Sequence, residues 1–183
     1  MIFGFLRKNN VNRAIVERQY GILTTAGRQK AFYLDADVPD TVMGRFEMLS
    51  VMMILYFRRS RTAGPVVTGI AQEIVDAFFQ DLDHSMRELG IGDQGVPKRM
   101  KKLASMFYGR VESYGNALDA SDGKALDAAL LRNFHPENPT GMLSMQRLAD
   151  YMMEAEQLLT NVPGDVLERG EAEILQMKDG EIK

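Results

Sequence analysis

The chain contains no cysteine, which excludes several kinds of protein. It can have no disulfide framework, no thiolate metal site and no thiol nucleophile. The absence suits a reducing compartment, where disulfides are rare. With 183 residues and an ordinary apolar content of 45%, the chain is long enough for one domain with a hydrophobic core of its own.

Long apolar runs are also absent. The most apolar stretch, residues 46–57, is interrupted by two polar residues and is shorter than the roughly 20 residues that a membrane-spanning helix needs. The N-terminus does not resemble a signal peptide, because the apolar residues 2–6 precede the cations Arg7 and Lys8 and no small-residue cleavage site follows. No Arg- and Ser-rich import sequence is seen. These features favour a bacterial cytoplasmic protein.

Recognisable catalytic and metal-binding patterns are missing as well. Asp81 and His84, with Glu88 a turn later, have helical metal-ligand spacing, but a di-iron bundle needs a second such motif and His135 does not supply it. We therefore interpret these residues as a solvated helix face. The glycines of residues 90–95 match a dinucleotide-binding pattern that has meaning only after a strand, and no strand is predicted. The sequence predicts no enzyme, no metal and no cofactor.

The most informative stretch that is present, residues 70–118, is typical of a helical hairpin. Apolar residues recur every three or four positions in 74–89 and again in 100–118, so each helix has one apolar stripe that faces a core. The glycines of 90–95 suit a helix C-cap with positive φ. Pro97 can open the second helix, where its missing N–H is not needed.

The chain as a whole is predicted to be all-α, a single compact helical domain of about six helices built around this hairpin. The helix of residues 41–58 is apolar nearly all round, which is typical of a central helix or of one that receives a partner on one side. Asp40 is expected to cap it. The expected helices cover residues 12–34, 41–58, 70–89, 97–118, 125–133 and 143–159.

Three segments are expected along the chain. Residues 1–9 form an apolar and basic N-terminal segment, either a weak membrane-interface anchor or a terminus that packs on the body or stays disordered. Residues 10–163 form the helical domain, with a turn-dense loop at 134–141. Residues 164–183 are expected to be a polar surface tail.

The charges of the hairpin are sorted by sign. Its first helix and turn carry six acids against Arg87 alone, and its second helix opens with the basic run 98–102. Positive charge is unfavourable at a helix start, so the run indicates pairing with neighbouring acids or an anionic partner. Arg110 lies at the edge of the apolar face and is expected to pair with Asp83, which either fixes the hairpin or belongs to a binding site.

A second group of cations, Arg58, Arg59 and Arg61, ends the predicted 41–58 helix. It is either a solvated C-terminal cap or a contact for phosphate or lipid headgroups. Sequence-specific nucleic-acid binding is not predicted, because the net charge is -3 and no aromatic platform accompanies the basic run.

Several short runs follow one another in the order of a known family. They lie at residues 38–41 (Val-Pro-Asp-Thr), 44–49, 76–83, 87–93, 96–101 and 107–110 (Phe-Tyr-Gly-Arg). Together they resemble the ubiquinol–cytochrome c chaperone family. The resemblance implies an all-helical, non-enzymatic assembly chaperone for the cytochrome bc1 complex that binds newly made cytochrome b.

The resemblance also implies partners and a surface. The expected partner is cytochrome b or another bc1 subunit, with the ribosome and a small partner protein as further candidates, because mitochondrial members act with them. The expected location is cytoplasmic, with peripheral contact at the inner membrane as an extension. The residues carried over as a client or partner surface are Asp83, Arg87, Glu88, Asp93, Lys98, Lys101, Tyr108 and Arg110.

A second class of function stays open, a helical binding protein for a lipid, a quinone or another apolar ligand. Its cavity would lie between the 41–58 helix and the hairpin. A deep, closed cavity would favour this alternative, whereas an open apolar groove rimmed by the basic run would favour the chaperone. The many methionines of the predicted helices suit either a core or an adaptable client surface.

Overall fold

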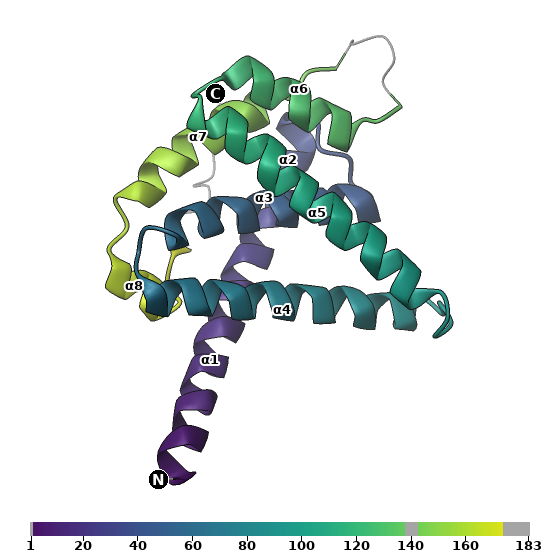
Figure 1. Cartoon of the computed structure of the whole chain (residues 1–183). Helices are drawn as coiled ribbons and strands as arrows, with labels where there is room; N and C mark the ends of the chain where they lie inside the picture. Colours follow the sequence, from purple (N-terminus) through teal and green to yellow (C-terminus); the bar gives the residue numbers. More distant parts are fainter. Residues whose placement is uncertain (1, 138–142, 174–183) are drawn as a thin grey trace.

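The computed structural model describes residues 2–137 and 143–173, with side chains from residue 12 onward, and every regular element in these ranges is a helix (Figure 1). The predicted all-α fold is confirmed. The described residues form eight helices rather than about six, because the first predicted helix is divided in two and a further short helix follows residue 163. The helices are α1 (Ile2–Gly27), α2 (Lys30–Asp35), α3 (Val42–Ser60), α4 (Pro65–Glu88), α5 (Val96–Asp119), α6 (Gly123–Phe134), α7 (Gln146–Thr160) and α8 (Gly164–Glu168).

The predicted helix of residues 12–34 is wrong at its start and in its middle. Helix α1 begins at Ile2, runs without a break past residues 9 and 10, and projects from the body at its N-terminal end (Figure 1). Helix α1 ends at Gly27. Gln29, which precedes α2, has an extended backbone at φ −62° and ψ 132°. The Tyr33 hydroxyl donates to the Gly27 carbonyl at 2.8 Å, so this side chain closes the end of α1.

Helix α3 is central, as its apolar sequence predicts. It contacts α1, α4, α5, α6 and α7, and its residues 50–56 are all buried. Its N-cap is Thr41 rather than the predicted Asp40: the Thr41 hydroxyl accepts a hydrogen bond from the Gly44 N–H at 3.0 Å. Asp40 instead forms an ion pair with Arg45 at 2.8 Å. Within the described residues, no helix is both long and apolar enough to cross a membrane.

The predicted hairpin is present as α4 and α5. Helix α4 starts earlier than expected, at Pro65, because Gly64 adopts a φ of +104° and the proline occupies the first helical position. At its other end Gly90 has a φ of +79° and donates to Arg87 at 2.9 Å, which is the predicted glycine C-cap. The two helices pack through aromatic rings, with the Phe78 and Phe107 centroids 5.5 Å apart.

The C-terminal part of the domain differs from its prediction. Residues 164–172 are not a surface tail, because they form α8 and bury Leu167 and Ala172. The Ala172 N–H donates to the buried amide oxygen of Gln19 in α1 at 3.1 Å, and Arg18 donates to the Arg169 carbonyl at 2.9 Å. The rest of the predicted tail, 174–183, and part of the predicted loop, 138–142, lie outside the described residues.

Candidate functional site

The predicted acidic residues of the hairpin gather around one arginine at the α4–α5 turn. Arg87 donates to the carboxylate of Asp83 at 2.6 Å and also binds Asp93 across the turn. The imidazole of His84 lies 3.2 Å from Glu88. The acids at this end of the hairpin are thus paired with cations or imidazole of their own segment. The ordinary interpretation of such exposed pairs is that they fix the turn.

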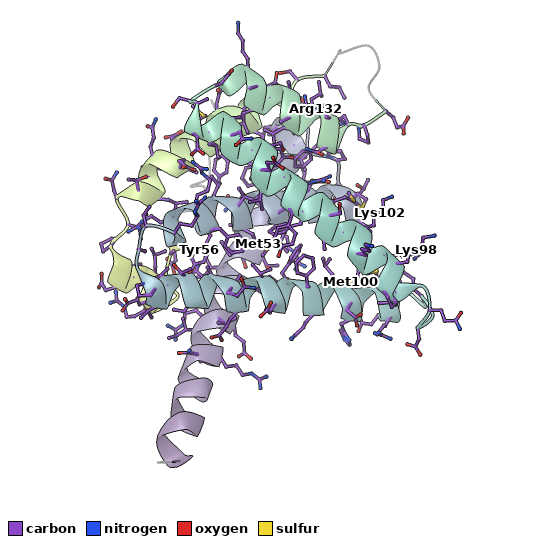
Figure 2. The ribbon with its side chains drawn as sticks, in the orientation of Figure 1. Met53, Tyr56, Lys98, Met100, Lys102 and Arg132 are labelled. Atoms are coloured by element: carbon purple, nitrogen blue, oxygen red, sulfur yellow. The ribbon has the colours of Figure 1, made fainter. Side chains whose placement is uncertain are left out.

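The basic run of α5 has no comparable partners. Lys98, Arg99, Lys101 and Lys102 are exposed, and none of them forms an ion pair with any described residue. Lys98 and Lys102 lie at the turn end of α5 (Figure 2). Tyr108 follows about two turns later, is 56% exposed, and stacks one face on a phenylalanine of α4 at 6.5 Å. These side chains therefore remain available for a partner.

Arg110 is the one predicted surface residue that the structure places inside the protein. Its partner is Glu47 of α3, not the predicted Asp83, with two guanidinium–carboxylate hydrogen bonds of 2.6 and 2.5 Å. A third bond of 2.8 Å runs from Arg110 to the Met106 carbonyl. Both side chains are almost fully buried. Arg110 is therefore not part of an exposed surface.

The environment of Glu47 explains why the pair matters. Burial raises the pKa of the Glu47 carboxyl, and the hydrogen bonds and charge of Arg110 oppose that rise. Either charge alone would lie in a low-dielectric interior without compensation. The pair links two of the family-like sequence runs, residues 44–49 in α3 and residues 107–110 in α5. It thus fixes α5 on the central helix α3.

An open apolar groove lies between the start of α3 and the hairpin, the position predicted for the cavity of the ligand-binding alternative. It has a volume of about 470 Å³ and is formed by the end of α1, the start of α3, the second half of α4 and Leu103 of α5. Val42, Met43 and Leu89 line it and are large apolar side chains exposed to solvent. The apolar lining residues are Val42, Met43, Phe46, Leu49, Phe78, Leu82, Met86, Leu89 and Leu103.

The rim of this apolar groove is charged, but it does not contain the basic run 98–102 that was expected at the rim of a chaperone groove. Arg28 and Arg45 lie on the side of α1 and α3, and Asp81 and Glu88 lie on the side of α4. A partly exposed apolar centre with a polar rim is the usual anatomy of a protein-binding surface. One feature of the sequence indicates the groove: the apolar side chains of α3 continue into its first turn, where a helix end normally meets solvent. Among the described residues, most other methionines are buried, including Met48, Met52 and Met53. Met53 is labelled in Figure 2.

The three arginines at the end of α3 serve largely internal contacts. Arg58 donates to both oxygens of Glu156 at 2.8 Å and to Asp119 at 2.6 Å. Arg59 donates to the Val162 carbonyl at 2.6 Å. The pairing of Arg58 raises its pKa, chiefly through the hydrogen bonds to Glu156. Arg58 therefore joins α3, α5 and α7 rather than forming a solvated cap.

Replacing Arg58 by methionine is expected to lower the free energy of unfolding by about 1–3 kcal/mol, because hydrogen bonds to charged groups are lost and Glu156 loses its partner. Urea unfolding followed by circular dichroism measures this. The control is Arg61→Gln, an exposed residue of the same trio, with an expected change within about 0.5 kcal/mol. Equal effects of the two substitutions would contradict this role for Arg58.

The metal-like spacing on α4 does not assemble a site. Among residues 2–137 and 143–173, no three acidic or histidine side chains cluster as metal ligands would. Asp81 accepts a hydrogen bond from the Tyr20 hydroxyl at 3.0 Å, and burial raises the pKa of that tyrosine. His135 contacts the Asp37 carbonyl at 2.7 Å, far along the chain from His84. Asp81 and His135 are thus engaged in separate contacts.

Comparison with known proteins adds independent information. The family model described as ubiquinol-cytochrome C chaperone matches residues 34–174. Ubiquinol-cytochrome-c reductase complex assembly factor 1 of Xenopus laevis is 23% identical over 141 residues, which are 76% of this chain and 70% of that protein. The human protein of the same name is 25% identical over 76% of this chain, but this match spans only 47% of its length.

A solved structure is similar over nearly the whole chain. It is the crystal structure of the Cbp3 homolog from Brucella abortus, with a TM-score of 0.82 and 49% sequence identity, covering 93% of this chain and 94% of that one. The helical arrangement described above is therefore that of a known fold.

Proposed function

Because this chain belongs to the ubiquinol–cytochrome c chaperone family, we propose that it is an assembly chaperone for the cytochrome bc1 complex that binds newly made cytochrome b. The similar proteins are named as assembly factors, not as enzymes. Residence in a bacterial cytoplasm, at the inner membrane, belongs to the same proposal.

The single observation that carries the proposal is the open apolar groove. A membrane protein such as cytochrome b must hide apolar segments from water until they enter the bilayer, because exposed apolar surface drives aggregation. Val42, Met43 and Leu89 present apolar surface at the mouth of the groove, and only Met43 has a flexible thioether that adapts to varied shapes. An amphipathic or apolar helix is the occupant that fits such a groove.

The groove also distinguishes the chaperone from the ligand-binding alternative. A small apolar ligand is usually held in a site that encloses most of its surface. Here the lining side chains Val42 and Leu89 are 76% and 72% exposed, so the apolar surface faces outward. This geometry favours a macromolecular client over a lipid or quinone.

The test is a double substitution that charges the groove without changing net charge, Met43→Glu with Leu89→Lys. Met43 lies in the first turn of α3 and Leu89 at the end of α4, so each new charge has the sign that the helix dipole favours. We expect recovery of cytochrome b by the tagged protein from membranes, measured by mass spectrometry, to fall at least about tenfold, because charges would be buried against an apolar client.

The matched control is Val66→Glu with Leu158→Lys. These residues are also exposed and apolar, and also lie near the start and the end of helices, but outside the groove. The control should recover cytochrome b like the parent. Unchanged recovery with the groove variant would move the client surface elsewhere. If the parent carries a lipid or quinone and no bc1 subunit, the chaperone proposal fails.

A further inference from the structure

The α4–α5 turn carries positive charge that the fold itself does not use. Lys98, Arg99, Lys101 and Lys102 are exposed and have no acidic partner among the described residues. The acids nearest to them along the chain are already engaged, Asp83 and Asp93 by Arg87, and Glu88 beside His84. The next acid along α5 is Glu112, ten residues after Lys102.

The position of these cations within α5 makes their isolation more informative. Helix α5 begins at Val96, so the four cations occupy its first two turns, where the partial positive charge of the backbone disfavours them. Neither the helix dipole nor an internal pair accounts for them. An anion supplied by a partner would satisfy both the side chains and the helix start.

One exposed apolar residue lies at the turn, and one exposed aromatic residue lies further along α5, about two helical turns after the basic run. Leu89, the residue that ends α4, is 72% exposed at the turn, and Tyr108 is 56% exposed on α5. On α5, Lys101 and Tyr108 are seven residues apart and so lie on one face of the helix. We define the tip surface as Leu89, Lys98, Lys101, Lys102 and Tyr108.

We propose that the tip surface docks on an anionic membrane surface, with the lysines at the lipid headgroups and with Leu89 and Tyr108 at the interface. Basic side chains next to a few exposed apolar and aromatic ones are the combination that binds the anionic bilayer interface. Tyrosine in particular favours the headgroup level. Single-stranded RNA sites stack successive bases on several aromatic side chains, and Tyr108 is the one aromatic residue of the tip surface.

This proposal goes beyond the client and does not depend on it. It has one consequence for the groove, because Leu89 belongs both to the tip surface and to the groove lining. Docking of the tip surface would place one end of the groove at the lipid headgroups. A client held there would already lie beside the bilayer that it enters.

The test uses the full chain and vesicles in a co-sedimentation assay. The vesicles contain phosphatidylcholine alone or phosphatidylcholine and phosphatidylglycerol in equal amounts. We expect binding to the anionic vesicles only, weakened by salt, and we expect Lys98→Glu/Lys101→Glu to reduce the partition coefficient at least about tenfold. Leu89→Ser is expected to reduce binding less, and equally at low and high salt.

The matched control is Lys124→Glu with Arg132→Glu, the same charge change on the exposed face of α6. Arg132 lies on α6, away from the start of α5 where Lys98 and Lys102 lie (Figure 2). Circular dichroism confirms that each variant is folded. The control should bind like the parent.

The proposal is overturned if the parent does not bind anionic vesicles or if the lysine variant binds them equally. It is also overturned if the protein binds single-stranded RNA through these lysines and does not bind vesicles. Loss of vesicle binding with cytochrome b recovery intact would separate this proposal from the chaperone function.

Discussion

Replacing either member of the Glu47–Arg110 pair by methionine is expected to lower the free energy of unfolding by about 3–5 kcal/mol, since each change leaves one buried charge without a partner. For a domain of this size the total stability is about 5–15 kcal/mol, so each variant approaches the limit of a stable fold. Urea unfolding at neutral pH, followed by circular dichroism, measures the loss.

The double variant Glu47→Met/Arg110→Met is the informative control for this pair. Well-packed apolar residues of similar volume replace a buried ion pair at little cost or with a gain, so the double variant is expected to be more stable than either single one. Strictly additive losses would show that the residues act through packing and not through their mutual charge. In that case the two residues do not stabilise the fold by compensating each other's buried charge.

The Arg110→Met variant should also have a characteristic pH dependence. Burial raises the pKa of Glu47, and the substitution removes the opposing guanidinium. The folded variant then holds a proton that the unfolded chain releases, so its stability falls as pH rises from the ordinary carboxyl pKa of 4.5 upward. The stability gap between the parent and this variant should therefore widen from pH 5 to pH 8.

Substitution of Gly44 by alanine is expected to have the second large effect, a loss of about 3 kcal/mol or more in the free energy of unfolding. A Cβ at this position would lie 1.9 Å from the Pro39 carbonyl oxygen and 3.0 Å from its carbon. These are backbone atoms, so they cannot yield as a side chain would. The N–H of Gly44 is also the donor of the Thr41 cap, and a shift of the chain would break that bond as well.

The matched control is Gly109→Ala. Gly109 also lies within a helix, but a Cβ there meets no atom within 4 Å. Alanine should stabilise the helix by about 0.5–1 kcal/mol, because glycine loses more conformational freedom on folding. Thermal unfolding of the Gly44→Ala and Gly109→Ala variants measures both changes in stability. A similar loss of stability at both positions would show that the effect at Gly44 does not come from the contact with Pro39.

The hairpin and the central helix could be predicted because their signals are local. Apolar residues at helical spacing identify α4 and α5, and Gly90 and Pro97 identify their ends. The same local reasoning recognised that Arg110 needs a buried carboxylate. It predicted Asp83, a carboxylate of the same hairpin, as the partner. The actual partner lies 63 residues away in the sequence on a different helix, and a local pattern does not indicate it.

The openness of the groove and the docking of the C-terminus could not be predicted, for a related reason. The groove forms where four helices meet, and the apolar pattern of a single helix does not show whether the groove is open or closed. Leu167 and Ala172 are isolated apolar residues in a polar segment, so composition alone indicates a tail. Burial of such residues depends on a surface offered by α1 and α4, which only the tertiary structure reveals.

The connection between α1 and the segment after α8 has a consequence for how this protein folds during its synthesis. The hydrogen bond from Ala172 to Gln19 joins residues 153 positions apart, and Arg58 meets Glu156 across 98 positions. Helical proteins usually fold fast because their contacts are local, whereas contacts between distant residues slow the search. Here α3 emerges from the ribosome early, yet the part of its apolar surface that α7 covers stays exposed until α7 is made. The nascent chain therefore passes through a long, aggregation-prone interval, and folding can be completed only when almost all of the described chain has been translated.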